Sequence, residues 1–187
     1  YEGKENCEVQ IISSGPDSQL QNIRNNYLRL IAKAERSIYI QTPYFIPDEA
    51  MLSALMIAIH SGVQVHIMIP CKPDHPFVYR ATEYFAKDIL EAGANVYLYQ
   101  DGFFHSKVMV IDDEIATVGS ANMDVRSFRL NFEINSFIYD PIIAEELVAN
   151  FNRDIEKSQK IDLAYFEKQS KWRKFKQQFS RLLSPIL

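Results

Sequence analysis

Six residues at fixed offsets in one short segment are of types that suit chemistry on a phosphoester: His105, Lys107, Asp112, Gly119, Ser120 and Asn122. Lys107 can neutralise phosphate oxygens as a compact charge. Ser120 and Asn122 can donate hydrogen bonds to the same oxygens. His105 can act as a nucleophile or as a proton donor. The segment therefore predicts a phosphoryl-transfer site.

The chain around these residues predicts a hairpin of two strands. Residues 104–112 are rich in β-branched side chains, acidic residues 112–114 interrupt the run, and residues 115–118 resume it. Side chains alternate along a strand, so His105 and Lys107 are expected on one face. The hairpin would thus present both side chains to the same ligand.

The remaining motif residues divide into two groups by position. Ser120 and Asn122 lie just past the second strand and are two positions apart, so their side chains are expected to point the same way and can meet those of His105 and Lys107. Asp112 is an odd number of positions from His105, so its side chain is expected on the opposite face, and it lies at the turn. A structural role for Asp112, through hydrogen bonds to the turn backbone, is therefore expected rather than contact with substrate.

Glu133 is a carboxylate within an apolar strand that is predicted over residues 131–139. A buried carboxylate is costly unless it is paired. A hydrogen bond to Nδ1 of His105 would satisfy Glu133 and hold the imidazole tautomer. A salt bridge to Arg126 or Arg129 is the alternative.

Strands and helices alternate along the whole chain. Strands are expected at residues 8–12, 37–41, 63–69 and 95–99 in addition to those above, and helices at residues 18–34, 48–62, 76–91 and 142–156. Such alternation predicts an α/β sandwich with a mixed, mostly parallel sheet flanked by helices. The length of 187 residues and the 47% hydrophobic content fit one domain with a substantial core.

The last residues of the chain differ in charge from the rest. Residues 165–187 contain six basic residues and one acidic residue, a net charge of +5, in a chain whose net charge is −4. Residues 1–164, the expected catalytic half-domain, therefore carry −9. Trp172, Phe175 and Phe179 recur at helical spacing, which predicts a helix at an anionic membrane surface. The alternative is that this apolar stripe packs on the domain or on an absent half.

The pattern His-x-Lys-x4-Asp-x6-Gly-Ser-x-Asn resembles the signature of the phospholipase D superfamily in full. The flanking sequences at residues 14–17, 42–48, 102–105, 119–128 and 130–133 are similar to the C-terminal catalytic half of bacterial cardiolipin synthases. The resemblance implies a phosphate site made by His105, Lys107, Ser120 and Asn122. It also implies a structural role for Asp112 and a role for Glu133 in orienting the histidine ring.

The chain carries one such motif, whereas single-chain members of the superfamily carry two. None of the other histidines, His60, His66 and His75, is followed two residues later by lysine. We therefore expect a fragment that is inactive alone and that completes its site with the N-terminal half of the same polypeptide, or as a homodimer. The chain begins at Tyr1 and has no apolar run near the ~20 residues of a membrane span, as expected of a piece of a longer protein.

The resemblance also implies a reaction. Phosphatidyl transfer between two phosphatidylglycerol molecules would give cardiolipin and glycerol through a phosphohistidine intermediate, with His105 as general acid and then general base. The enzyme is expected at the bacterial cell membrane, with its catalytic domain on the cytoplasmic side. No cofactor is expected, and carboxylates and histidines do not cluster at metal-ligand spacing.

Two other functions are consistent with parts of the sequence. A single-motif homodimeric phosphodiesterase or nuclease would need a basic groove, and the charge of −9 over residues 1–164 argues against a nucleic-acid partner. A lipid-binding module without activity is the second alternative, and the intact motif argues against it.

Overall fold

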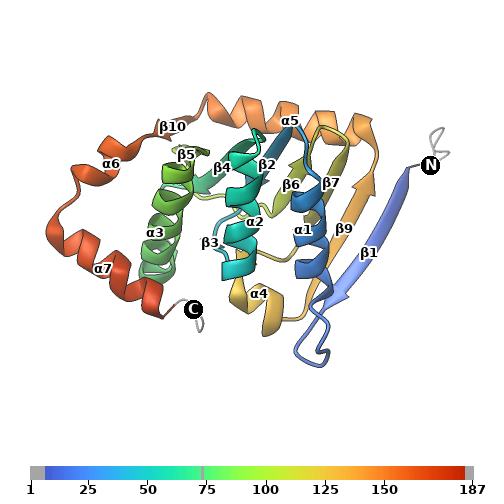
Figure 1. Cartoon of the computed structure of the whole chain (residues 1–187), viewed down its shortest axis with the longest axis horizontal. Coiled ribbons are helices and arrows are strands. Elements are labelled where there is room, and N and C mark those ends of the chain that lie inside the picture. The colour runs from blue at the N-terminus through green and yellow to red at the C-terminus, as the bar shows by residue number, and fades with distance from the viewer. Residues whose placement is uncertain (1–6, 73, 184–187) are drawn as a thin grey trace.

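The computed structural model describes residues 7–72 and 74–183 and places a mixed eight-stranded sheet between helices (Figure 1). The strand order is β1-β9-β7-β6-β2-β4-β5-β10. These strands are β1 (Glu8–Ser14), β2 (Ser37–Gln41), β4 (Gln64–Pro70), β5 (Asn95–Tyr99), β6 (Val108–Ile111), β7 (Ile115–Gly119), β9 (Glu133–Tyr139) and β10 (Ser158–Ile161).

The α/β class with a mixed sheet is confirmed, but parallel pairing is restricted to the middle of the sheet. β2 pairs with β4 and β4 with β5 in parallel, and the other five neighbouring pairs are antiparallel. The expectation of a mostly parallel sheet was therefore wrong for the half that contains the motif. There a tight hairpin joins β6 and β7 and makes them antiparallel neighbours, and β2 and β9 pair antiparallel on either side of this hairpin.

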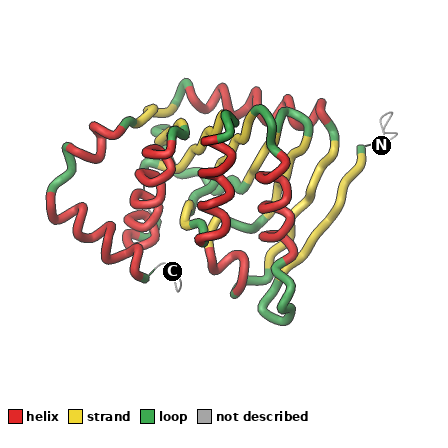
Figure 2. Tube along the Cα trace, viewed as in Figure 1, coloured by secondary structure: helices red, strands yellow, loops and turns green. Residues whose placement is uncertain are grey.

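Helices α1 (Asn22–Lys33), α2 (Glu49–His60) and α3 (Pro76–Ala92) lie side by side on one face of the sheet, and α5 (Pro141–Ile155) covers the other (Figures 1 and 2). The ends of these helices follow from their sequences. Asp48 caps α2 by accepting the N–H of Met51 at 2.9 Å. Gly93 ends α3 in the left-handed region, with φ of 114°, where a side chain would be strained.

The largest part of the core lies beneath α1, α2 and α3, and two smaller clusters lie beneath α5. Ile38, Ile40 and Ile67 belong to the first, whereas Met68 and Val110 face α5. The alternation of Ile67 and Met68 along β4 assigns successive side chains to opposite faces of the sheet. The central strands are apolar because both of their faces are covered.

Several elements begin later than the sequence predicts or were not predicted. Helix α1 begins at Asn22 rather than at residue 18, because the Ser18 hydroxyl accepts the N–H of Leu20 in a local turn. The sequence did not predict the short elements β3 (Phe45–Ile46), β8 (Met123–Asp124) and α4 (Val125–Arg129), which lie near the motif, or α6 (Leu163–Glu167), which follows β10. Helix α7 (Lys171–Leu182) is the C-terminal helix that the spacing of Trp172, Phe175 and Phe179 predicts. Among the described residues, no helix is long and apolar enough to cross a membrane.

Candidate active site

The motif lies where β6 begins and β7 ends. The backbone N–H of Gly119 donates to the carbonyl of Lys107 at 3.3 Å, which joins the two parts of the motif at the same end of these two strands. His105 and Lys107 were expected to lie on a strand. Strand β6 begins only at Val108, so neither residue does. Their side chains nevertheless meet, because Lys107 folds back so that its Nζ lies 2.8 Å from both Nδ1 and the carbonyl oxygen of His105.

The environment of Lys107 weakens its hold on a proton. The side chain is 7% exposed, and burial lowers its pKa to about 8, against the opposing pull of the carboxylates of Glu133, Asp124 and Asp74. A negatively charged phosphate that enters the site would favour the protonated amine. The lysine is therefore placed to bind an anion in a partly dry setting, where charge interactions are strong.

The protonation of His105 follows from its contact with Lys107. Desolvation, and then the Lys107 charge, lower the pKa of His105 below its usual range. An ammonium group can only donate, so Nδ1 of the neutral imidazole accepts from Lys107 and the ring proton lies on Nε2. The exposed histidine can therefore present an N–H proton donor to a ligand.

The Gly-Ser-x-Asn segment is held against β9 by a buried amide. Asn135 accepts the N–H of Ala121 at 3.2 Å and donates to the Tyr27 hydroxyl at 2.9 Å. At Gly119, an added Cβ would lie 2.4 Å from the side chain of Asn135 and from the carbonyl of Ile134. Only glycine allows this close approach, which fixes the path of the chain into the site.

The small sheet of β3 and β8 brings a second segment to the motif. Phe45 pairs with Met123, and the N–H of Met123 donates to the Thr42 hydroxyl at 3.3 Å. Tyr44 therefore lies at the site, with its ring edge-on to His105 at a centroid distance of 6.5 Å. Its neighbour Phe45 is fully buried in the core.

A cavity of about 350 Å³ opens beside the motif. Asn122 faces it, and the side-chain oxygen of Asn122 is buried without a hydrogen-bond partner among the described residues. Arg126 adds a positive charge to the lining. The cavity therefore offers polar and charged groups to a phosphoester headgroup. The full lining is Tyr44, His75, Pro76, Phe77, Val78, Asn122, Asp124, Arg126 and Asn131.

Glu133 does not make the contact that was predicted for it. Its carboxylate accepts hydrogen bonds from the Ser120 hydroxyl and, at 3.2 Å, from the Asn131 amide. It makes no hydrogen bond to His105, whose Nδ1 is occupied by Lys107. No ion pair of the described residues joins Glu133 to Arg126 or Arg129 either. The carboxylate therefore orients Ser120 in this structure.

Asp112 lies at the far end of β6 from Lys107 and supports the fold. It begins the two-residue centre of a tight turn, in which Asp112 and Asp113 have φ of 55° and 57° and the N–H of Glu114 donates to the carbonyl of Ile111. The Asp112 carboxylate accepts the backbone N–H groups of residues 35, 36 and 37 at 2.9, 2.7 and 2.8 Å. These hydrogen bonds are of the structural kind that was expected, but they are made to the residues at the start of β2 rather than to the turn itself.

The sequence did not single out Asp74 or Asp124. Asp74 accepts the Tyr44 hydroxyl, and although burial opposes its ionisation, this bond and backbone N–H groups lower its pKa. Burial raises the pKa of Asp124, which lines the cavity and caps α4. Asp74 lies in a Pro-flanked loop, where spacing carries no signal for a site. Across residues 7–72 and 74–183, no three His, Cys, Asp or Glu side chains are grouped so that they could hold a metal ion.

Sequence comparisons relate the chain to a known family. Residues 27–155 match the family model described as the phospholipase D-like domain of cardiolipin synthase. The chain is 55% identical over its full length to the major cardiolipin synthase ClsA of Bacillus subtilis, and 52% identical to a cardiolipin synthase of Listeria welshimeri. It spans 39% of the length of each of these relatives.

Solved structures share the fold at low sequence identity. The phosphatidylserine synthase of Haemophilus influenzae superposes with a TM-score of 0.79 at 18% identity, over 97% of this chain and 48% of that one. Nuc of Salmonella typhimurium, a phospholipase D family member, superposes with a TM-score of 0.70 at 22% identity, over 84% of this chain and 99% of that one. The family model, which matches more than half of the chain, shows that the chain belongs to the family of phospholipase D-like domains of cardiolipin synthases.

Proposed function

We propose that this chain supplies one of the two catalytic motifs of a phosphatidyltransferase that converts two phosphatidylglycerol molecules into cardiolipin and glycerol. The contact between Lys107 and His105 carries the proposal, because it places a proton donor next to a phosphate-binding cation. Asn122 faces the adjoining cavity, where its amide N–H can donate to a phosphate oxygen. Relatives that are 52% and 55% identical to the chain are named cardiolipin synthases.

The first half-reaction cleaves the donor lipid. A histidine from the second motif attacks phosphorus and forms an N–P bond while the bond from phosphorus to the glycerol oxygen breaks. When Lys107 moves onto the phosphate, Nδ1 of His105 is free to take up a proton from solvent. The resulting imidazolium gives its Nε2 proton to the departing glycerol oxygen, so glycerol leaves as a neutral alcohol and the ring is left neutral. Lys107 and the Asn122 amide stabilise the negative charge on the nonbridging oxygens.

The second half-reaction transfers the phosphatidyl group. A hydroxyl of the second phosphatidylglycerol attacks phosphorus, and its proton passes to Nε2 of His105. The N–P bond breaks, and its electron pair returns to the attacking histidine. The products are cardiolipin and, once Nδ1 has returned its proton to solvent, an enzyme in its starting protonation state. His105 therefore acts as general acid and then as general base.

The site needs a second half that carries the other histidine. The chain spans 39% of the length of its relatives, so an N-terminal half of the same polypeptide can supply it. Exposed apolar side chains surround the motif, among them Phe103 beside His105, and Phe132 and Ile134 on either side of Glu133. We infer that the second half covers these side chains. A homodimer of the isolated chain is the alternative assembly.

The substrate class also implies a location. Phosphatidylglycerol is an anionic membrane lipid, so the reaction takes place at the surface of the bacterial cell membrane. We propose the cytoplasmic side. Nucleic acid is not a proposed partner, because residues 1–164 carry a net charge of −9 and an acidic domain repels a polyanion.

A chimera tests the proposal directly. This chain would replace the matching segment of the Bacillus subtilis relative, to which it is 55% identical. With phosphatidylglycerol vesicles, the chimera should form cardiolipin and equimolar glycerol, as measured by mass spectrometry. The His105→Ala chimera should form neither. The isolated chain should also be inactive. Cardiolipin synthesis by the monomeric chain alone would overturn the proposal that the chain holds only half of the active site.

A further inference from the structure

Helix α7 packs on the domain with its polar side and turns its apolar side outward. Gln177 and Ser180 are buried, whereas Trp172 is 62% exposed. The apolar residues are spaced three or four positions apart and so form one stripe along the helix. We call this set the outer stripe: Trp172, Phe175, Phe179 and Leu182, all of which are exposed. The alternative that this stripe packs on the domain is therefore not observed in the part of the chain that the structure describes.

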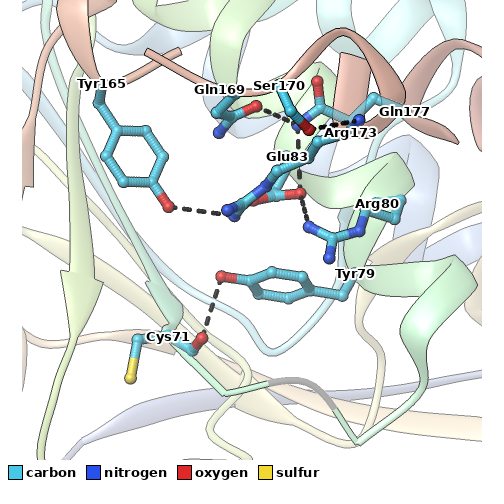
Figure 3. Close-up of polar contacts among 9 residues, drawn as sticks. All are labelled: Cys71, Tyr79, Arg80, Glu83, Tyr165, Gln169, Ser170, Arg173 and Gln177. Atoms are coloured by element: carbon cyan, nitrogen blue, oxygen red, sulfur yellow. Dashed lines mark hydrogen bonds and ion pairs between the residues drawn. The ribbon is translucent and has the colours of Figure 1, made fainter. Parts of the chain in front are cut away.

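A buried carboxylate on α3 holds α7 in this orientation (Figure 3). Glu83 is 2% exposed and forms ion pairs with Arg80 on its own helix and with Arg173 on α7. The Gln177 amide also donates to Glu83 at 3.1 Å. Burial opposes the charged form of Arg173, but Glu83 outweighs this effect and raises the pKa of Arg173. Because a buried charge must keep its partners, the polar contacts fix which side of α7 faces α3.

Basic side chains accompany the outer stripe. Exposed Lys171 and Lys176 lie next to it in sequence, and Lys176 Nζ is 5.4 Å from the centre of the Trp172 ring. The Trp172 and Phe175 rings stack at a centroid distance of 5.5 Å. Aromatic rings with adjacent lysines are typical of helices that lie in a membrane interface, where the lysine stems extend to the headgroups.

The distribution of charge favours an anionic bilayer as the occupant of this surface. Residues 165–187 carry +5, while residues 1–164 carry −9. An anionic surface would repel most of the domain and attract this segment, so the molecule would approach with α7 first. A second copy of the chain is a poorer match, because two +5 segments would face each other across the interface.

The outer stripe is continuous with the candidate active site. A groove of about 320 Å³ runs between α7 and the start of α3 and is lined by Phe77, Trp172, Phe175 and Phe179, among others. Its lining shares Pro76 and Phe77 with the cavity that Asn122 faces. The apolar surface and the phosphate site therefore meet at Pro76 and Phe77, at the N-terminal end of α3.

We propose that the outer stripe and Phe77 form a docking surface for an anionic phospholipid bilayer, and that docking presents lipid headgroups to the active-site cavity past Phe77. The docking itself depends only on α7 and its charge. The statement that the presented lipid is the substrate rests on the proposed function.

Trp172 allows the docking to be measured in the 187-residue chain, since it is the one tryptophan of the sequence. With phosphatidylglycerol vesicles at low salt, its fluorescence should shift to shorter wavelength, and the chain should co-sediment with the vesicles. Phosphatidylcholine vesicles and high salt should reduce both signals, because the attraction is electrostatic and is screened. The double variant Phe175→Ser/Phe179→Ser should bind at least about tenfold more weakly.

The matched control is Ile57→Ser, which removes an apolar side chain that is 66% exposed on α2, outside the outer stripe. It should bind vesicles as the parent chain does. An unchanged Trp172 spectrum, with or without co-sedimentation, would overturn the proposal, and so would equal binding by the double variant. A spectral shift that depends on protein concentration without lipid, with dimers seen by analytical ultracentrifugation, would assign the surface to a second copy instead.

Activity separates this inference from the proposed function. In the chimera described above, the double variant should lose turnover severalfold on phosphatidylglycerol vesicles but keep it on monomeric short-chain phosphatidylglycerol. Equal losses on both substrates would overturn the role of docking in catalysis. If the parent chimera had no activity on either substrate, the proposed function would fail, while the fluorescence result would still decide the docking.

Discussion

Lys107 Nζ lies 2.8 Å from Nδ1 of His105, and this contact couples the two most reactive groups of the motif. The lysine fixes the imidazole proton on Nε2, while the same contact and burial lower the pKa of the histidine. Burial also lowers the pKa of the lysine to about 8. An incoming phosphate would draw Lys107 away from His105 as it binds, and this would leave the histidine free to titrate during the reaction.

Replacing Lys107 separates catalysis from stability. Lys107→Met keeps the apolar stem but removes the charge, so turnover by the chimera should fall by about 100- to 1000-fold. The free energy of unfolding, measured with urea, should stay the same or rise because a partly buried charge is removed. Lys33→Met, at an exposed position of α1, should change neither quantity. A Lys107→Met chimera within tenfold of the parent would show that Lys107 does not contact the phosphate.

The lowered pKa of Lys107 gives its stability contribution a defined dependence on pH. The folded-state pKa is about 8, below the ordinary value of 10.5, so between these values the unfolded chain holds a proton that the folded chain has released. The contribution of Lys107 to the free energy of unfolding should therefore rise as the pH rises from 8 to 10.5. Urea unfolding of the parent chain and of Lys107→Met across this range isolates the effect. A difference between them that stays flat or falls would contradict the shift.

Asp112 should act on stability and not on chemistry. Asp112→Asn tolerates the positive φ but weakens the acceptance of three backbone N–H groups, so the free energy of unfolding should fall by about 1–3 kcal/mol. Asp113→Asn is the matched control at the adjacent turn position, which also has positive φ, and it should be nearly neutral. Turnover per folded chimera should be unchanged for both variants, and a specific loss in Asp112→Asn would place Asp112 in the reaction.

The sequence predicted the motif hairpin and most of the larger helices and strands, because apolar periodicity and caps such as Asp48 and Gly93 are local signals. The sequence did not predict hydrogen-bond partners that depend on how distant parts of the chain come together in the fold. Glu133 was assigned to His105, but the chain before β6 turns so that Lys107 occupies Nδ1. Asn135, which holds the Gly-Ser-x-Asn segment, carries no motif signal at all.

The orientation of α7 could not be predicted either. An amphipathic pattern shows that a helix has two sides, but it does not show which side packs on the domain. Here a buried carboxylate 90 residues earlier in the chain decides, because Glu83 selects the polar side that contains Arg173. Only the fold places Glu83 and Arg173 in contact.

Glu83→Gln should therefore release α7 from the domain. The substitution keeps the side-chain volume but leaves Arg80 and Arg173 without their shared counter-charge, so the free energy of unfolding should fall by about 1–3 kcal/mol. Limited trypsin digestion should cut α7 faster at the exposed Lys171, Lys174 and Lys176, because a detached helix unfolds locally and its backbone can then enter the protease site. Glu91→Gln, which breaks an exposed pair with Lys87 on the same helix, should cost less than about 1 kcal/mol and leave the digestion unchanged. If both variants behaved alike, the orientation of α7 would depend on contacts other than Glu83, such as that of Arg181 with the Tyr84 ring.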